Sequence, residues 1–258
     1  MMHSIMSRKR SLMIQMSTCS SIVVIWTILS LYFPSILIPS PYETLLALWD
    51  ITRSGELLQQ LYLTAMRMIA GLATGMSLAI IWGLLAGRFA VIYEMFRPII
   101  AFLLGIPPII LVVVAMVWFG TNSIIPIFVV SVLVFPTFYV NIANGYRQID
   151  IQLLQMATVY KKSTWQKLRF VILPSLIVPF FTACSLAAGG AVRITIMAEL
   201  LGTSSGIGAA LTMARININT DKVFAWTLIS VLAILAIDSF ILNPLKARMM
   251  KWNMEESR

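Results

Sequence analysis

The sequence predicts an all-helical membrane protein, and its composition, its long uncharged runs and its distribution of positive charge all support that class. Of its 258 residues, 59% are hydrophobic and 11% are charged, whereas a soluble domain carries about 25% charged residues. Disordered chains are poor in apolar residues, so intrinsic disorder is excluded. The net charge of +9 is typical of nucleic-acid binding, but the basic residues lie in short tracts between apolar blocks. We therefore expect no nucleic-acid partner.

Six segments are long and apolar enough to be membrane spans, because a spanning helix needs about 20 mostly apolar residues. The runs do not alternate as the strands of a membrane β-barrel would, and helices are therefore predicted. The predicted spans cover residues 20–38, 68–87, 99–119, 124–141, 170–192 and 223–242, with a hairpin at residues 120–123 between the third and the fourth.

The first predicted span has an alternative interpretation as a cleaved signal peptide. Arg8, Lys9 and Arg10 would then form its basic region. The apolar run is long and no clear small-x-small cleavage site follows it, so we expect a retained span.

The distribution of lysine and arginine predicts the orientation. With six spans and an inner N-terminus, 14 of the 19 basic residues face inward and five face outward. This asymmetry favours a multi-pass membrane protein with both termini in the cytoplasm. Residues 147–169 would then be cytoplasmic, and residues 39–63 and 193–222 would face outward.

Small residues recur at every fourth position of the second predicted span. They are Gly71, Gly75, Ala79, Gly83 and Gly87. This spacing lets helix backbones approach closely in lipid, and we expect the face to pack against another span. The pattern is common in membrane bundles and indicates no particular activity.

Two adjacent prolines, Pro107 and Pro108, interrupt the third predicted span. Proline lacks the backbone donor and clashes with the preceding turn, so we expect a bend or a break. Broken helices often line the pathway of a transporter, whereas in many other membrane proteins a proline is only a kink. Both interpretations remain open.

The cytoplasmic segment after Asp150 is the most informative stretch. It alternates apolar and polar residues and predicts short amphipathic helices, broken around residues 161–163. Pro174 suits the first turn of the fifth span. An interfacial helix on the lipid and a docking element for a cytoplasmic partner explain the residue pattern equally well.

This segment resembles the cytoplasmic loop of binding-protein-dependent ABC importer permeases. That family carries Glu-Ala-Ala, a glycine four residues on, a hydrophobic residue and Leu-Pro at fixed spacing. The corresponding residues here are Gln155, Met156, Ala157, Lys161, Val171, Leu173 and Pro174. Ala157 and the last three match, whereas Gln155, Met156 and Lys161 depart. The resemblance implies a coupling helix that sits in a groove of an ATPase subunit.

Four further blocks resemble the same family in the expected order. They are residues 61–87, 98–128, 134–150 and 197–211. The last reads MAELLGTSSGIGAAL and resembles the taurine, aliphatic sulfonate and nitrate permeases. The resemblance covers about residues 40–245 and implies a type I ABC importer permease-like bundle.

The expected organisation has three parts. Residues 1–60 hold the N-terminal tail, the first transmembrane helix and an outer amphipathic segment. Residues 61–245 are the permease transmembrane domain, with the coupling loop at about 147–170, and residues 246–258 are a cytoplasmic basic tail.

The resemblance also implies the partners: a second permease chain in a homodimer, two cytoplasmic ABC ATPase subunits and an extracytoplasmic solute-binding protein. No Walker A sequence is present, so we expect ATP and magnesium on the partner ATPase and no cofactor on this chain. Its two cysteines and single histidine give no metal-ligand spacing. The expected function is import of a small solute by alternating access, most closely a taurine-, sulfonate- or nitrate-like anion.

Several polar residues in or near the predicted spans are candidate functional residues. Asp238, in the sixth span, either reaches the interface or has a function in the membrane. Three roles remain open for Glu199 and Arg193. They pair with each other, they cap a helix, or they line the translocation pathway. Gly206 and Gly208 are predicted to form a flexible outer turn and are candidate pathway or gating residues. They are too closely spaced for a nucleotide-binding fingerprint.

Other functions are weaker interpretations. A membrane-embedded enzyme needs a cluster of acids, histidines or cysteines at membrane depth, and the sequence offers none. The departures at Gln155, Met156 and Lys161 leave open a permease-like accessory protein without transport activity. Import of a vitamin precursor or another small organic solute is a further alternative.

Overall fold

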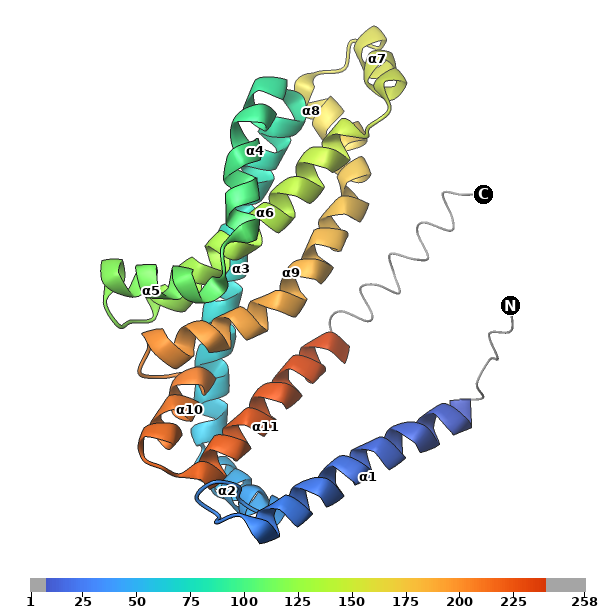
Figure 1. Ribbon diagram of the computed structural model, residues 1–258. Helices are drawn as coiled ribbons and strands as arrows, with labels where there is room; N and C mark the ends of the chain where they lie inside the picture. The colour runs from blue at the N-terminus through green and yellow to red at the C-terminus, as the bar shows by residue number, and fades with distance from the viewer. Residues whose placement is uncertain (1–7, 240–258) are drawn as a thin grey trace. The chain divides into compact units, whose positions relative to one another are not determined.

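The computed structural model describes residues 8–239, which form helices and connecting turns without any strand (Figure 1). The helices are α1 (Arg8–Tyr32), α2 (Pro41–Arg53), α3 (Glu56–Arg88), α4 (Ala90–Gly105), α5 (Pro108–Phe119), α6 (Ile124–Arg147), α7 (Ile151–Val159), α8 (Thr164–Lys167), α9 (Leu173–Gly202), α10 (Ile207–Ile216) and α11 (Thr220–Ile237). A π-helical turn, Leu168–Ile172, joins α8 to α9. The predicted all-helical class is confirmed. The predicted basic tail, residues 246–258, lies outside the described residues.

Four helical stretches in the described part of the chain are long and apolar enough to cross a membrane. They are α3, α6, the continuous stretch Thr164–Gly202, and α11. The α4–α5 pair is a fifth candidate, and the apolar part of α1, Met16–Tyr32, is shorter. Length and composition therefore support four or five of the six predicted spans.

Several helix ends differ from the predicted span ends. The first span was expected to reach residue 38, but α1 ends at Tyr32, because Pro34 disfavours helical backbone in the residue before it. The spans were also delimited by charged residues, whereas α3 and α9 continue through Arg67 and Glu199. These two charges neutralise each other inside the protein, as described below.

The break predicted at the two prolines is confirmed. Ile106 and Pro107 have extended backbone, with ψ of 126° and 134°, and Pro108 opens α5. The axes of α4 and α5 meet at 100°. Proline suits the first turn of a helix because no intrahelical acceptor faces that position.

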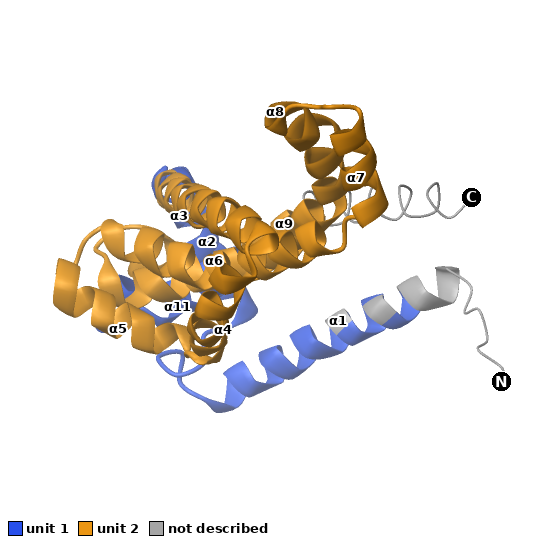
Figure 2. Ribbon diagram, turned by 90° about the horizontal axis from the view of Figure 1, so that it is seen from above, with its two compact units in different colours: residues 1–58, 211–229 blue, residues 59–210, 230–258 orange. Residues whose placement is uncertain are grey.

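The chain divides into two compact units, residues 1–58 with 211–229 and residues 59–210 with 230–258 (Figure 2). In the first unit a capping box between Ser40 and Glu43 starts α2, within the outer segment where an amphipathic helix was expected. The indole of Trp26 stacks on Phe224 at 5.7 Å and donates a 3.0 Å hydrogen bond to the carbonyl of Pro39.

In the second unit, the small residues of α3 lie against α6. Each glycine of this repeat faces α6. The α6 groups nearest to the four glycines belong to Val130, Ser131, Ile142 and Tyr146. A methyl group on Gly75 would lie 2.5 Å from the carbonyl oxygen of Ser131. No larger side chain fits there without moving one of the two helices.

The α9 helix packs along α6 in the same unit. Ala183, Ala187 and Ala191 are buried in the shared core. Gly145 of α6 receives the ring of Pro179, and Gly202 of α9 receives Ile125. Small residues on both sides thus bring α3, α6 and α9 close together.

Candidate functional site

The segment between α6 and α9 forms two short helices, as the sequence predicts. The first, α7, ends at Val159, and the second, α8, begins at Thr164. Pro174 lies in the first turn of α9. The predicted break around residues 161–163 and the predicted start of the fifth span are therefore confirmed.

A left-handed turn at Lys161 ends α7. The amide of Lys161 donates to the carbonyl of Thr158 at 2.9 Å, and the amide of Lys162 donates to that of Ala157 at 3.0 Å. These are the two hydrogen bonds of a Schellman motif. Lys161 has a φ of 50°, in the region that glycine adopts without steric cost. The backbone therefore keeps a glycine-type turn where the resembling family carries glycine, although the residue is lysine.

A second set of local hydrogen bonds begins α8 and ties it to α7. The Ser163 hydroxyl accepts from the amide of Gln166, and the Gln166 side chain accepts from the amide of Ser163, which is a capping box. The ammonium of Lys167 donates to the Thr158 hydroxyl at 2.9 Å. The segment is thus an ordered helical loop.

The α7 helix exposes apolar side chains on the side away from the rest of its unit. Leu154 packs with Ile149 and Ile172, whereas Met156 is 55% exposed and Val159 is 79% exposed. Exposed apolar groups on a short helix whose end is fixed by hydrogen bonds are typical of a surface that a partner covers. Gln155, at the first position of the resembling motif, is exposed as well.

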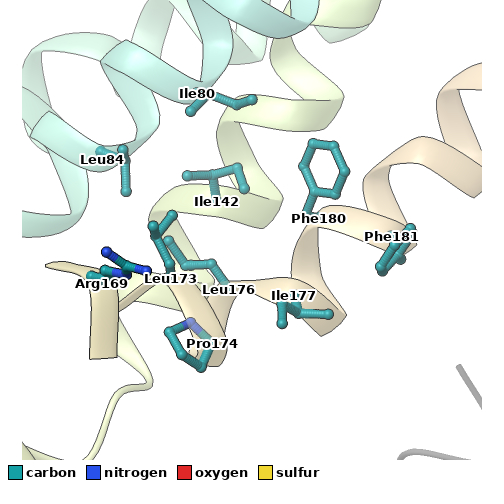
Figure 3. Close-up of a pocket in the computed structure, with 10 residues that line it drawn as sticks. All are labelled: Ile80, Leu84, Ile142, Arg169, Leu173, Pro174, Leu176, Ile177, Phe180 and Phe181. Carbon is teal, nitrogen blue, oxygen red and sulfur yellow. The ribbon is translucent and has the colours of Figure 1, made fainter. Parts of the chain in front are cut away.

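An apolar pocket of about 660 Å³ lies beside the end of this loop (Figure 3). Its walls come from α3, α6 and α9, and Leu173 and Pro174 are among the lining residues. Among the described residues that line it, Arg169 is the one with a charge. A pocket lined mainly by carbon suits an apolar group better than a small anion, which needs several donors.

A buried ion pair, Arg67 with Glu199, is the second feature of this unit. The guanidinium Nη1 lies 2.7 Å from the Glu199 carboxylate, and the two side chains are 5% and 0% exposed. Glu199 also accepts hydrogen bonds from the Thr64 hydroxyl at 2.8 Å and from the amide of Gly208 at 3.2 Å. Buried charges persist when they are paired and hydrogen-bonded in this way.

The guanidinium of Arg67 makes four hydrogen bonds. Nη1 donates to the Ser205 carbonyl at 2.6 Å as well as to Glu199, and Nη2 donates to the hydroxyls of Ser205 and Ser123 at 2.7 and 2.8 Å. One side chain therefore joins α3 to α9, to the turn after α9 and to the turn before α6.

Gly206 and Gly208 let that turn approach Glu199. A methyl group on Gly206 would collide with the Glu199 carboxylate, and one on Gly208 would collide with the carbonyl of Ile196. Gly206 also has a φ of 101°, which is unfavourable for any other residue. The carboxylate lies at the N-terminus of α10, where the helix dipole favours a negative charge.

The structure brings together only some of the residues singled out from the sequence. Glu199, Gly206 and Gly208 form one cluster, but the suggested pairing of Glu199 with Arg193 is wrong. The partner is Arg67, and Arg193 is exposed. Asp238 directly follows α11 and is half-buried.

Sequence reasoning missed the α3 side of this cluster, Gln60, Thr64 and Arg67. A signal was present, because these residues continue the face of the small-residue stripe at helical spacing. An arginine on a face that packs against other helices must be buried, and a buried arginine needs an acidic partner.

Comparison with protein families identifies the chain. The family described as binding-protein-dependent transport system inner membrane component matches residues 75–244. The chain belongs to this family. It is therefore the membrane permease subunit of an ABC importer and a multi-pass inner-membrane protein.

Curated relatives of this permease carry transport names. An aliphatic sulfonates transport permease protein SsuC of Bacillus subtilis (strain 168) is 30% identical over 216 residues, which are 83% of this chain and 78% of the relative. The SsuC protein of Escherichia coli (strain K12) is 31% identical over 204 residues, 78% of each chain. The taurine transport system permease protein TauC of the same strain is 24% identical over 244 residues, 91% of this chain and 87% of the relative.

A solved structure supports the fold. An inward-facing structure of the MetNI methionine ABC transporter matches with a TM-score of 0.52 and 18% identity, covering 76% of this chain and 96% of that chain. At this identity the likeness shows the fold alone. The predicted type I importer permease bundle is confirmed.

Proposed function

We propose that this permease imports a small sulfonate-like anion such as taurine or an alkanesulfonate. Two copies would form the pore, an extracytoplasmic binding protein would deliver the solute, and two cytoplasmic ATPase subunits would supply the energy. The observation that carries the substrate class is the likeness to two sulfonate permeases over 78% or more of this chain.

The α7 helix is the proposed site of ATPase docking. Its outer apolar face and its ordered turn at Lys161 support this role, because a rigid helix transmits motion where a flexible loop would absorb it. When ATP brings the ATPase subunits together, the movement of α7 would reach α9 through the continuous helical stretch Thr164–Gly202. The permease would then alternate between inward-open and outward-open states.

The cofactors in this proposal belong to the partners. ATP and magnesium would bind the ATPase, and this chain would bind no cofactor of its own and catalyse no reaction. The excess of basic residues in the segments predicted to face inward supports an orientation with both termini in the cytoplasm.

The first experiment is purification of the tagged chain in mild detergent with identification of every co-purifying protein by mass spectrometry. We expect an ATPase with a Walker A sequence at about one copy per permease chain, because each α7 would occupy one ATPase groove. Recovery of the permease alone, with no ATPase cross-linked at Lys161 or Lys162, would favour the accessory protein without transport activity.

The substrate is tested by uptake into proteoliposomes that contain the purified complex, the binding protein and internal ATP. Labelled taurine, an alkanesulfonate, nitrate and riboflavin are compared at equal concentration. Accumulation of a sulfonate that stops without ATP supports the proposal, and accumulation of riboflavin alone would show that the solute is a vitamin-type compound.

A further inference from the structure

The turn after α9 is attached to α3 by three side chains on one face of that helix. Gln60, Thr64 and Arg67 are spaced about one helical turn apart and point the same way. Gln60 accepts from the amide of Gly206 at 2.6 Å, and Thr64 accepts from the amide of Ile207 at 2.9 Å. We call residues 203–208 the latch segment.

The same cluster reaches two further elements. Glu199 belongs to α9 and accepts from the amide of Gly208 in the latch segment. Arg67 donates to the Ser123 hydroxyl, which lies at the start of α6. Four elements from three distant parts of the sequence thus share one hydrogen-bonded network around a single ion pair.

Burial makes this network costly to open. Glu199 is fully buried and Arg67 nearly so, so separating them would leave a charge without water or a partner in a medium of low dielectric constant. Gly206 and Gly208 already lie against Glu199 with no spare space. Small shifts within the cluster would therefore produce collisions or unpaired polar groups.

We propose that Arg67 and Glu199 are positioning residues that hold α3, α9, the latch segment and the start of α6 as one rigid body throughout the transport cycle. This inference rests on the proposed function. It implies that the opening for the solute forms between this body and another part of the transporter, and that the latch segment does not act as a gate that lifts away from α3.

Hydrogen–deuterium exchange of the permease–ATPase complex tests the rigidity directly. The amides of Gly206, Ile207 and Gly208 are hydrogen-bonded to side chains of α3 and α9. We expect their exchange rates to agree within a factor of two between the nucleotide-free complex and the complex trapped with ATP and vanadate. A tenfold faster exchange in either state would overturn the proposal.

A variant comparison tests the role of the ion pair in the same measurement. Glu199→Gln removes the charge and should accelerate exchange of the latch segment at least tenfold, while peptides of α7 stay unchanged. Arg88→Met removes an exposed arginine of α3, the helix that carries Arg67, and serves as the control, with no change expected in the latch segment. Equal exchange in wild type and Glu199→Gln would show that the pair does not hold the segment.

A disulfide gives the functional test. The hydroxyls of Ser123 and Ser205 both accept from Nη2 of Arg67, so the two positions lie close together, and electrophoresis first checks that cysteines introduced there form a cross-link on oxidation. In a chain with Cys19→Ser and Cys184→Ala, we expect Ser123→Cys/Ser205→Cys to take up solute equally well when reduced and when oxidised, within a factor of two. A tenfold loss on oxidation that a reductant reverses would show that these elements must separate.

Failure of the proposed function gives a different result from failure of the latch. If the wild-type complex takes up no solute, the importer proposal fails, whereas the exchange comparison of wild type with Glu199→Gln still decides whether the ion pair holds the segment. If the wild-type complex takes up solute normally, two results overturn the rigid-body inference alone. One is a tenfold difference in exchange of the latch segment between the two states, and the other is a tenfold, reversible loss of uptake when the cross-link forms.

Discussion

The Arg67 guanidinium and the Glu199 carboxylate lie 2.7 Å apart inside the permease, although the residues are 132 positions apart in the sequence. Both helices that carry them were expected to be apolar between their flanking charges. Both charges therefore lie in the interior of the protein, and each one is compensated there by the other.

Removing one partner of this pair should destabilise the protein strongly. Glu199→Gln or Arg67→Met should lower the free energy of unfolding by about 3–5 kcal/mol, because the remaining group is left buried and uncompensated. The double variant Arg67→Met/Glu199→Gln should lose less than the sum of the two single variants. Thermal unfolding in detergent measures all four proteins, and strictly additive losses would contradict the coupling.

Glycine at position 161 should raise the stability of the protein and lower its rate of solute uptake. Lys161→Gly should stabilise the protein by about 1 kcal/mol, because a left-handed conformation costs a residue with a Cβ atom roughly that amount. Uptake should nevertheless fall, because we expect the partner ATPase to be adapted to the lysine. Thermal unfolding and proteoliposome uptake report the two effects separately.

Lys162→Gly is the matched control for that experiment. Lys162 is also exposed and basic, but Lys161 and Ile218 are the non-glycine residues of the described part with positive φ. Glycine at position 162 should therefore bring no gain in stability. An equal gain at both positions would rule out backbone strain as the cause.

The exposed face of α7 should determine ATPase binding without affecting the fold. Met156→Glu places a charge on a side chain that is 55% exposed, so the melting temperature should change little. The amount of ATPase that co-purifies should drop at least tenfold, because a charge would have to be buried against the ATPase groove. Gln152→Glu, an exposed position of the same helix, should retain the ATPase, and equal retention by Met156→Glu would argue against docking through this face.

The contact between α3 and α6 should not tolerate a methyl group at Gly75. Gly75→Ala would lie 2.5 Å from the Ser131 carbonyl oxygen, and overpacking of this kind typically costs about 1–3 kcal/mol. Gly105→Ala is the control, since no atom lies within 4 Å of a Cβ at that position. Thermal unfolding should show a loss for Gly75→Ala alone, and equal stability of the two variants would contradict the close helix approach.

Much of the fold could be predicted because its signals are local. Uncharged runs identify apolar helices, Pro107 and Pro108 identify the break, and the polar interval at residues 161–163 identifies the end of α7. Local rules failed at the helix ends near Arg67 and Glu199. There, a distant opposite charge makes burial possible, and no window of sequence contains both residues.

The sequence by itself determined the class of the protein, the face of α3 that packs and the loop that resembles an ATPase-coupling element, since composition and periodicity are properties of neighbouring residues. The partner of Glu199, the attachment of the latch segment and the glycine-type turn kept at Lys161 were decided only by the tertiary structure. These depend on which helices approach one another and on which buried polar groups must then find partners, because an unpaired charge or amide away from water is too costly to keep.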